Sequence, residues 1–233
     1  MGSYQYVDIF ATKGIEYLFV IGFLLTLVVF WRYLNRSTVL PNAAATARLI
    51  PTTPWFRMAD GLYFHQGHSW ARVEDNGTVV VGMDDFAQKL VGEMNTIQLP
   101  KPGETVRQGT KAWDLVIDSR SLPMRSPVSG QVVEVNDEVL SSPRVVNADP
   151  YERGWLLKVR PKGFKDDVTN LLSGDLARAW MEQTSNMLRT WSSGSLGVVL
   201  QDGGLPVQGI ARNMSQEKWH EIASEFLLHT PSE

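Results

Sequence analysis

The chain of 233 residues contains no cysteine. It therefore cannot hold a disulfide, a cysteine-ligated zinc ion or iron–sulfur cluster, or a thiol nucleophile, which excludes many redox and hydrolytic mechanisms. An excess of positive charge is also missing, because 22 Lys and Arg residues stand against 25 Asp and Glu residues. We therefore do not expect nucleic acid or another polyanion as a partner.

Motifs that carry chemistry are scarce as well. The sequence has no Gly-rich phosphate loop and no G-x-S-x-G. His65 with His68, and Glu217 with His220, could each begin a metal site, but neither pair has a second half, so we expect no metal. Asp84-Asp85 is better explained as a helix cap than as a pair of catalytic carboxylates. We therefore expect a protein that is not an enzyme and has no cofactor or small-molecule substrate.

One long apolar run is present near the start of the chain. The stretch YLFVIGFLLTLVVFW carries no charge, begins at Tyr17 and continues through Arg32 to Leu34. It is short against the roughly 20 residues of a membrane span, but Arg32 can extend its charge to the interface and aromatic residues suit both ends. The run therefore predicts a single transmembrane helix from Tyr17 to Leu34.

Two other interpretations of this run stay open. A cleaved signal peptide fits less well, because Asp8 and Glu16 precede the run and bulky aromatic residues end it. A buried helix of a soluble domain is the other alternative.

Basic residues around the run predict its orientation. Arg32, Arg36 and Arg48 follow the run, and only Lys13 precedes it. Because basic residues favour the cytoplasmic side, we expect a single-pass protein of the bacterial inner (cytoplasmic) membrane whose C-terminal part faces the cytoplasm.

The remaining sequence suggests three further segments. Residues 37–61 are rich in proline and small residues, which predicts a linker or a strap rather than a core element. Between residues 62 and 160, short apolar runs alternate with turn signals such as Asn76-Gly77, which predicts a small β-sandwich or barrel. Within it, Asp84 or Asp85 can cap a helix that contains Phe86 and Leu90.

Helical periodicity follows Pro161 and completes a domain that we place at residues 62–191. The predicted apolar stripes comprise Val168, Leu171, Leu172, Leu176, Ala179, Trp180, Gln183, Met187, Leu188 and Trp191.

A shorter unit is expected at residues 192–233. The stretch LGVVLQDGGLPVQGIA predicts a hairpin that turns at Asp202, and Ser215 can cap a helix whose apolar face includes Trp219 and Phe226. Because about 40 residues bury too little surface to fold alone, we expect this unit to pack on the β domain or on a partner.

Several phrases occur in a specific order: HSWARVE, VVGMDDFAQKLVGEM, LPKPGETVRQG, SPVSGQVVEVN and SPRVVNADPYERGWLLKV. In that order they resemble the glycine cleavage system H-protein, a lipoyl-carrying member of the biotinyl/lipoyl domain class, from about Leu62 to Gln183. The resemblance implies a mainly β fold, the lipoyl β-sandwich or barrel-sandwich hybrid, with C-terminal helices. To it the sequence adds the transmembrane helix and the small hairpin-plus-helix unit.

The resemblance also implies where a lipoyl group would be attached. H-proteins present a lysine at a hairpin tip, typically in E-S-V-K-A, and the register places Ser119 at the lysine, Val116 at the glutamate and Arg120 directly after. A hydroxyl would give an ester, and a guanidinium stays protonated, so neither replaces the amine. The nearest lysine, Lys111, is expected at the far end of the strand, and sliding the register would exchange the two faces.

We therefore expect a non-lipoylated tip, with Ser119 as the degenerate position and Asp118 and Arg120 as polar neighbours. The expected function is that of a non-catalytic accessory subunit of a bacterial inner-membrane complex, of the respiratory or electron-transfer class, that uses its H-protein-like domain for docking. Expected partners are other subunits of that complex and the lipid bilayer. The alternative is a lipoyl-type carrier or partner module of one-carbon or sulfur metabolism tethered to the membrane.

Overall fold

The computed structural model describes residues 9–34, 55–192 and 206–228. The chain forms two compact units, Met1–Thr52 and Thr53–Glu233. In the first unit, helix α1 (Ile9–Leu34) is described, and its large apolar side chains between residues 17 and 31 are exposed. None of the helices in the described segments was found to be long and apolar enough to cross a membrane.

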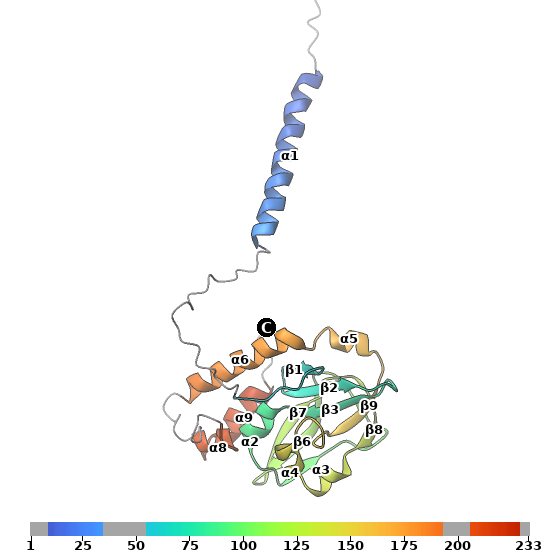
Figure 1. The fold of residues 1–233 in the computed structure, drawn as a ribbon, viewed down its shortest axis with the longest axis vertical. Helices are drawn as coiled ribbons and strands as arrows, with labels where there is room; N and C mark the ends of the chain where they lie inside the picture. The colour runs from blue at the N-terminus through green and yellow to red at the C-terminus, as the bar shows by residue number, and fades with distance from the viewer. Residues whose placement is uncertain (1–8, 35–54, 193–205, 229–233) are drawn as a thin grey trace, which may run out of the picture. The chain divides into compact units, whose positions relative to one another are not determined.

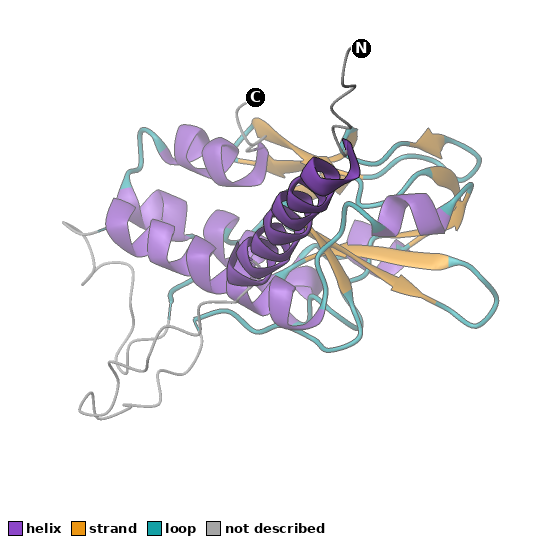
Figure 2. Ribbon diagram, turned by 90° about the horizontal axis from the view of Figure 1, so that it is seen from above, coloured by secondary structure: helices purple, strands orange, loops and turns teal. Residues whose placement is uncertain are grey.

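The second unit contains two antiparallel sheets (Figures 1 and 2). The larger sheet has the strand order β1-β2-β3-β9-β8-β5, and the smaller has the order β4-β6-β7. The strands are β1 (Tyr63–His65), β2 (Ser69–Val73), β3 (Val79–Met83), β4 (Thr96–Gln98), β5 (Thr105–Val106), β6 (Lys111–Ile117), β7 (Arg120–Arg125), β8 (Gly130–Val135) and β9 (Leu157–Pro161). The arrangement confirms the predicted β-sandwich.

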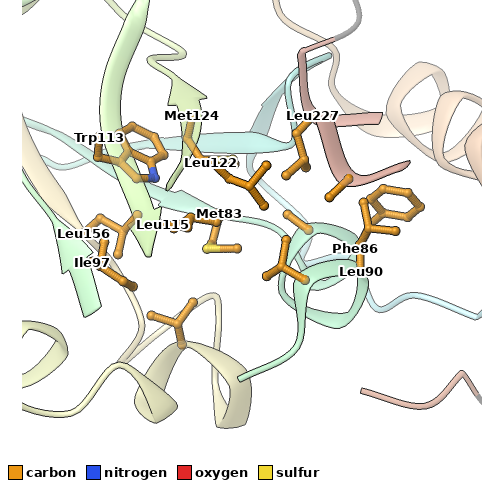
Figure 3. Packing of buried hydrophobic residues seen from close by; sticks show 14 of the residues in the cluster. Met83, Phe86, Leu90, Ile97, Trp113, Leu115, Leu122, Met124, Leu156 and Leu227 are labelled. Atoms are coloured by element: carbon orange, nitrogen blue, oxygen red, sulfur yellow. The ribbon is translucent and has the colours of Figure 1, made fainter. Parts of the chain in front are cut away.

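Alternating side chains of the strands build the core between the sheets. On β6, Trp113, Leu115 and Ile117 are buried while the residues between them are more exposed, as expected for a strand with one covered face. Burying each such side chain stabilises the fold by roughly 1.5–3 kcal/mol. Figure 3 shows Leu122 of β7 in the same packed cluster as Leu227, which comes from the last helix.

Helix α2 (Asp85–Val91) matches the sequence prediction, including its cap. The Asp84 carboxylate accepts a hydrogen bond from the Ala87 amide at 2.8 Å, which satisfies one of the free donors of the first turn. The other helices in the described residues of this unit are α3 (Asp137–Ser141), α4 (Arg144–Ala148), α5 (Phe164–Val168), α6 (Gly174–Trp191), α8 (Ile210–Met214) and α9 (Trp219–Leu228).

Helix α6 exists as predicted, but its buried face differs from the predicted stripe. Of that stripe Leu188 is buried, whereas Leu176, Met187 and Trp191 are exposed. The residues of α6 that face the core are Ala177, Met181, Thr184, Ser185 and Leu188. The buried hydroxyls are satisfied locally, since Thr184 donates to the Trp180 carbonyl at 3.0 Å and Ser185 donates to the Met181 carbonyl at 2.7 Å. Polar residues can therefore occupy the inner face at little cost.

The last residues of the predicted linker pack into the core of the β domain. Trp55 and Phe56 are buried, and the Arg57 amide donates to Asp85 at 2.8 Å. The Tyr151 hydroxyl donates to the Arg57 carbonyl at 2.6 Å. Burial, followed by the charge of Asp84, raises the pKa of Tyr151 well above its usual range, so that this hydroxyl stays protonated. The residues of the predicted linker before Trp55 lie outside the described segments.

Residues 206–228 pack on the β domain. The first strand and the turn of the predicted hairpin lie outside the described residues, and Ile210 and Ala211, expected at the end of its second strand, begin helix α8 instead. Gly209 takes a left-handed conformation just before this helix, and its amide donates to the Lys89 carbonyl of α2 at 2.8 Å. A Cβ atom on Gly92 would lie 2.8 Å from the Gly209 Cα, so this approach requires a glycine at position 92.

Candidate functional site: the β6–β7 hairpin tip

The hairpin joins β6 to β7 through a tight turn. Ile117 pairs with Arg120, which leaves Asp118 and Ser119 as the two turn residues. Both have positive φ angles, 46° and 66°, as in the two-residue turns that fit the twist of a hairpin. Because residues that carry a Cβ atom disfavour this left-handed conformation, contacts with neighbouring residues must stabilise the turn.

Two side chains hold Asp118 from opposite sides. Its backbone amide donates to the Asn95 side-chain oxygen at 2.9 Å. Its carboxylate lies 2.7 Å from a guanidinium nitrogen of Arg212 in α8. The first residue of the turn therefore contacts both the β domain and the C-terminal segment of residues 206–228, which we call the extension.

Helix α9 adds an aromatic contact next to the turn. The guanidinium groups of two arginines lie over the buried ring of Trp219. That of Arg120 is 6.0 Å from the ring centroid and that of Arg212 is 5.2 Å from it. His220 Nε2 lies 3.0 Å from the Ser121 carbonyl oxygen. We call Arg212, Trp219 and His220 the clamp. It joins the extension to the hairpin through an ion pair, cation–π contacts and a hydrogen bond.

The structure brings all three predicted site residues together. Ser119 stands at the tip, with Asp118 before it and Arg120 after it, and all three are exposed. Lys111 lies at the opposite end of β6, where it pairs with Arg125 across the hairpin and binds Asp114 at 2.7 Å. The tip itself thus offers a hydroxyl, a carboxylate and a guanidinium.

The histidines considered as metal ligands have other contacts. Burial, followed by Arg125 and His68, lowers the pKa of His65 from 6.5 to about 4, so this ring is neutral at physiological pH. His65 Nδ1 accepts from the Gly67 amide at 2.9 Å. His220 contacts the hairpin, as described above. Within the segments that the structure describes, no three His, Asp or Glu side chains are arranged to hold a metal ion.

The clamp is the part of the site that the sequence did not predict. The apolar face of the last helix, including Trp219, was expected to pack on something, but its spacing does not indicate the surface that it covers. Arg212 carried no signal, because it lies in a stretch that was interpreted as the end of a hairpin.

Comparisons with known proteins match the β domain and part of α6. The family model described as "Glycine cleavage H-protein" matches residues 62–184. A probable glycine cleavage system H protein from Pyrococcus furiosus is 35% identical over 127 residues, covering 54% of this chain and 92% of the relative. The glycine cleavage system H protein of Saccharophagus degradans is 36% identical over 121 residues, or 52% of this chain and 92% of the relative.

Among solved structures, a glycine cleavage system H protein from Mycobacterium marinum matches with a TM-score of 0.49 and 28% identity, covering 55% of this chain and 99% of that chain. The family model covers more than half of the chain, and the sequence relatives are matched over nearly their whole length. The chain therefore belongs to the glycine cleavage H-protein family.

Proposed function

We propose that this protein is a non-catalytic, membrane-anchored accessory subunit of a bacterial inner-membrane complex, and that its H-protein-like domain serves for docking without a lipoyl group. The observation that carries the proposal is the state of the hairpin tip. It presents Ser119 where the resemblance implies a lysine, and the clamp holds the residues on either side of it.

The chemistry of attachment supports this proposal. Lipoyl transfer forms an amide and needs an amine that can lose a proton, which a serine hydroxyl or a guanidinium does not supply. A carrier arm must also move between partners, whereas the Asp118 carboxylate and the Arg120 guanidinium are engaged by the extension. A tip of this kind is suited to a fixed contact.

The anchor is proposed from the first unit of the chain. The exposed apolar side chains of α1 between residues 17 and 31 are suited to contact lipid, and the arginines that follow favour a cytoplasmic location of the second unit. Partners would then be other subunits of the complex. Its assignment to the respiratory or electron-transfer class rests on analogy with cytoplasm-facing membrane complexes that recruit such modules.

The names of the relatives favour a second candidate, a carrier module tethered to the membrane. Intact mass spectrometry of the protein purified from native membranes separates the two. We expect the unmodified chain mass, together with co-purifying integral membrane proteins. A Ser119→Lys variant provides a matched standard, because it restores an amine at the tip. A lipoyl-sized addition on the wild-type chain would overturn the proposal in favour of the carrier.

A further inference from the structure

A hollow of about 240 Å³ lies between α6 and α9, away from the hairpin tip. Its lining residues are Gln66, His68, Trp180, Gln183, Thr184, Met187, Glu225 and Phe226. Met187, Glu225 and Phe226 lie beyond the residues that the family model matches. The hollow is therefore built partly by segments that this chain adds to the family domain.

One of the residues that line the hollow is a buried histidine. His68 is only 2% exposed, and its Nδ1 lies 2.8 Å from an oxygen of the buried Asp84 carboxylate. Phe86 stacks on the imidazole at 4.1 Å between ring centroids, and Trp180 packs against it at 4.7 Å.

The hydrogen-bond partner of His68 Nδ1 bears on whether Nε2 acts as a donor or as an acceptor. Because the Asp84 carboxylate accepts, Nδ1 is the donor of this contact, and in the neutral ring Nε2 is then the nitrogen that can accept a hydrogen bond. Nε2 has no hydrogen-bond partner among the described residues and is not among the fully enclosed atoms. His68 is one of the residues that line the hollow, so a group that enters it lies next to this side chain.

The charges around the hollow favour a cation. Glu225 stands among the lining residues, and the Asp84 carboxylate lies behind the imidazole. The lining set includes no lysine or arginine. The rings of Trp180 and Phe226 add faces that attract a cation. An ammonium group would satisfy the acceptor, the carboxylate and the aromatic walls together.

The surface beside the hollow indicates how this ammonium group is presented. Met187 and Trp191 of α6 are 44% and 49% exposed, and the Trp191 ring packs against Phe226 at 5.6 Å. Leu176, near the start of the same helix, is 63% exposed. We call Leu176, Met187 and Trp191 the α6 stripe. A small free amine would leave the α6 stripe in water, whereas a polypeptide segment would cover it.

We propose that the hollow receives a lysine side chain of a partner subunit, and that apolar residues flanking this lysine cover the α6 stripe. This inference rests on the proposed docking function and names the chemistry of one docking contact. The lysine ammonium donates a hydrogen bond to His68 Nε2 and pairs with Glu225.

The first experiment uses the complex purified from native membranes. Glu225→Gln should weaken partner binding about fivefold, the upper range for a partly exposed ion pair. Glu221→Gln, at an exposed position one turn earlier on the same helix that does not line the hollow, is the matched control and should have no effect. Met187→Lys should reduce partner recovery, because it places a charge in the α6 stripe and a second ammonium group beside the hollow. Asp84→Asn provides a fourth variant, because its amide can donate to His68 Nδ1 and shift the ring proton to Nε2, which would repel an ammonium.

The outcomes separate this inference from the proposed function. Partners that bind the Glu225→Gln and Met187→Lys variants as well as the wild type would overturn the inference and leave the docking function intact. A wild-type protein that purifies without partners would overturn the docking function itself, and the inference with it.

A photo-crosslinking residue at Gln183 identifies the occupant, with the same residue at the exposed Gln131 of β8 as the control. We expect Gln183 to link to a partner peptide in which a lysine stands among apolar residues. A peptide without a lysine, or adducts formed only with lipid, would overturn the inference.

Discussion

Asp84 serves two elements at once, which makes its replacement a sharp test of the structure. One carboxylate oxygen accepts from the Ala87 amide at 2.8 Å and caps α2, and the other lies 2.8 Å from His68 Nδ1. Asp84→Ala removes both contacts. Losing the cap costs about 1 kcal/mol, and leaving the buried imidazole nitrogen unpaired costs about 1–3 kcal/mol.

The expected destabilisation of Asp84→Ala is therefore roughly 2–4 kcal/mol, or about 4–16 °C in Tm for a domain of this size. Asp84→Asn should cost about 1 kcal/mol, because asparagine caps a helix as well as aspartate and its amide can still bond the imidazole. Thermal unfolding of the chain lacking residues 1–36, followed by circular dichroism, measures both variants against the wild type. Equal destabilisation by the two variants, or a loss below about 0.5 kcal/mol for Asp84→Ala, would refute the reasoning.

Further predictions concern pH, the tip and the membrane. His65 binds a proton less readily in the folded chain than in the unfolded chain, so its contribution to stability is complete above pH 6.5 and is lost as the pH falls toward 4; urea midpoints should show this loss in the wild type and less of it in His65→Gln. Ser119→Ala should change stability and complex recovery by no more than about 0.5 kcal/mol, whereas Trp219→Ala should destabilise the domain by about 3–5 kcal/mol in the same unfolding assay, since Trp219 is 5% exposed. Deleting residues 1–36 should release a folded domain from membranes, and retention of that chain after a carbonate wash would contradict the proposed anchor. Protease added to intact spheroplasts should spare the C-terminal domain, and its cleavage there would reverse the proposed topology.

The β domain was predictable because its signals are local and agree with one another. The Asp84 cap and the short apolar runs between turn signals follow from residue types at fixed spacings, whereas the position of Ser119 follows from the resemblance to H-proteins. The order of several such phrases then indicated the family, and the family model confirms it.

The inner face of α6 could not be predicted in the same way. Hydropathy favours Leu176 and Met187 over Thr184 and Ser185, but each hydroxyl satisfies itself on the carbonyl four residues earlier. This hydrogen bond offsets the free-energy cost of burying the hydroxyl, whereas a hydropathy pattern places every polar residue on the exposed face. The burial of Trp55 was not predicted either, because the three prolines in the preceding segment indicated a linker.

The clamp has a consequence for the order of events during synthesis. Trp219 is made 100 residues after Ser119, so at about 5–20 residues per second the hairpin leaves the ribosome roughly 5–20 s before the helix that covers it. A nascent chain therefore exposes the bare hairpin to solvent for that interval. An enzyme that acts on the tip meets it uncovered during translation, and afterwards meets it beside the docked extension.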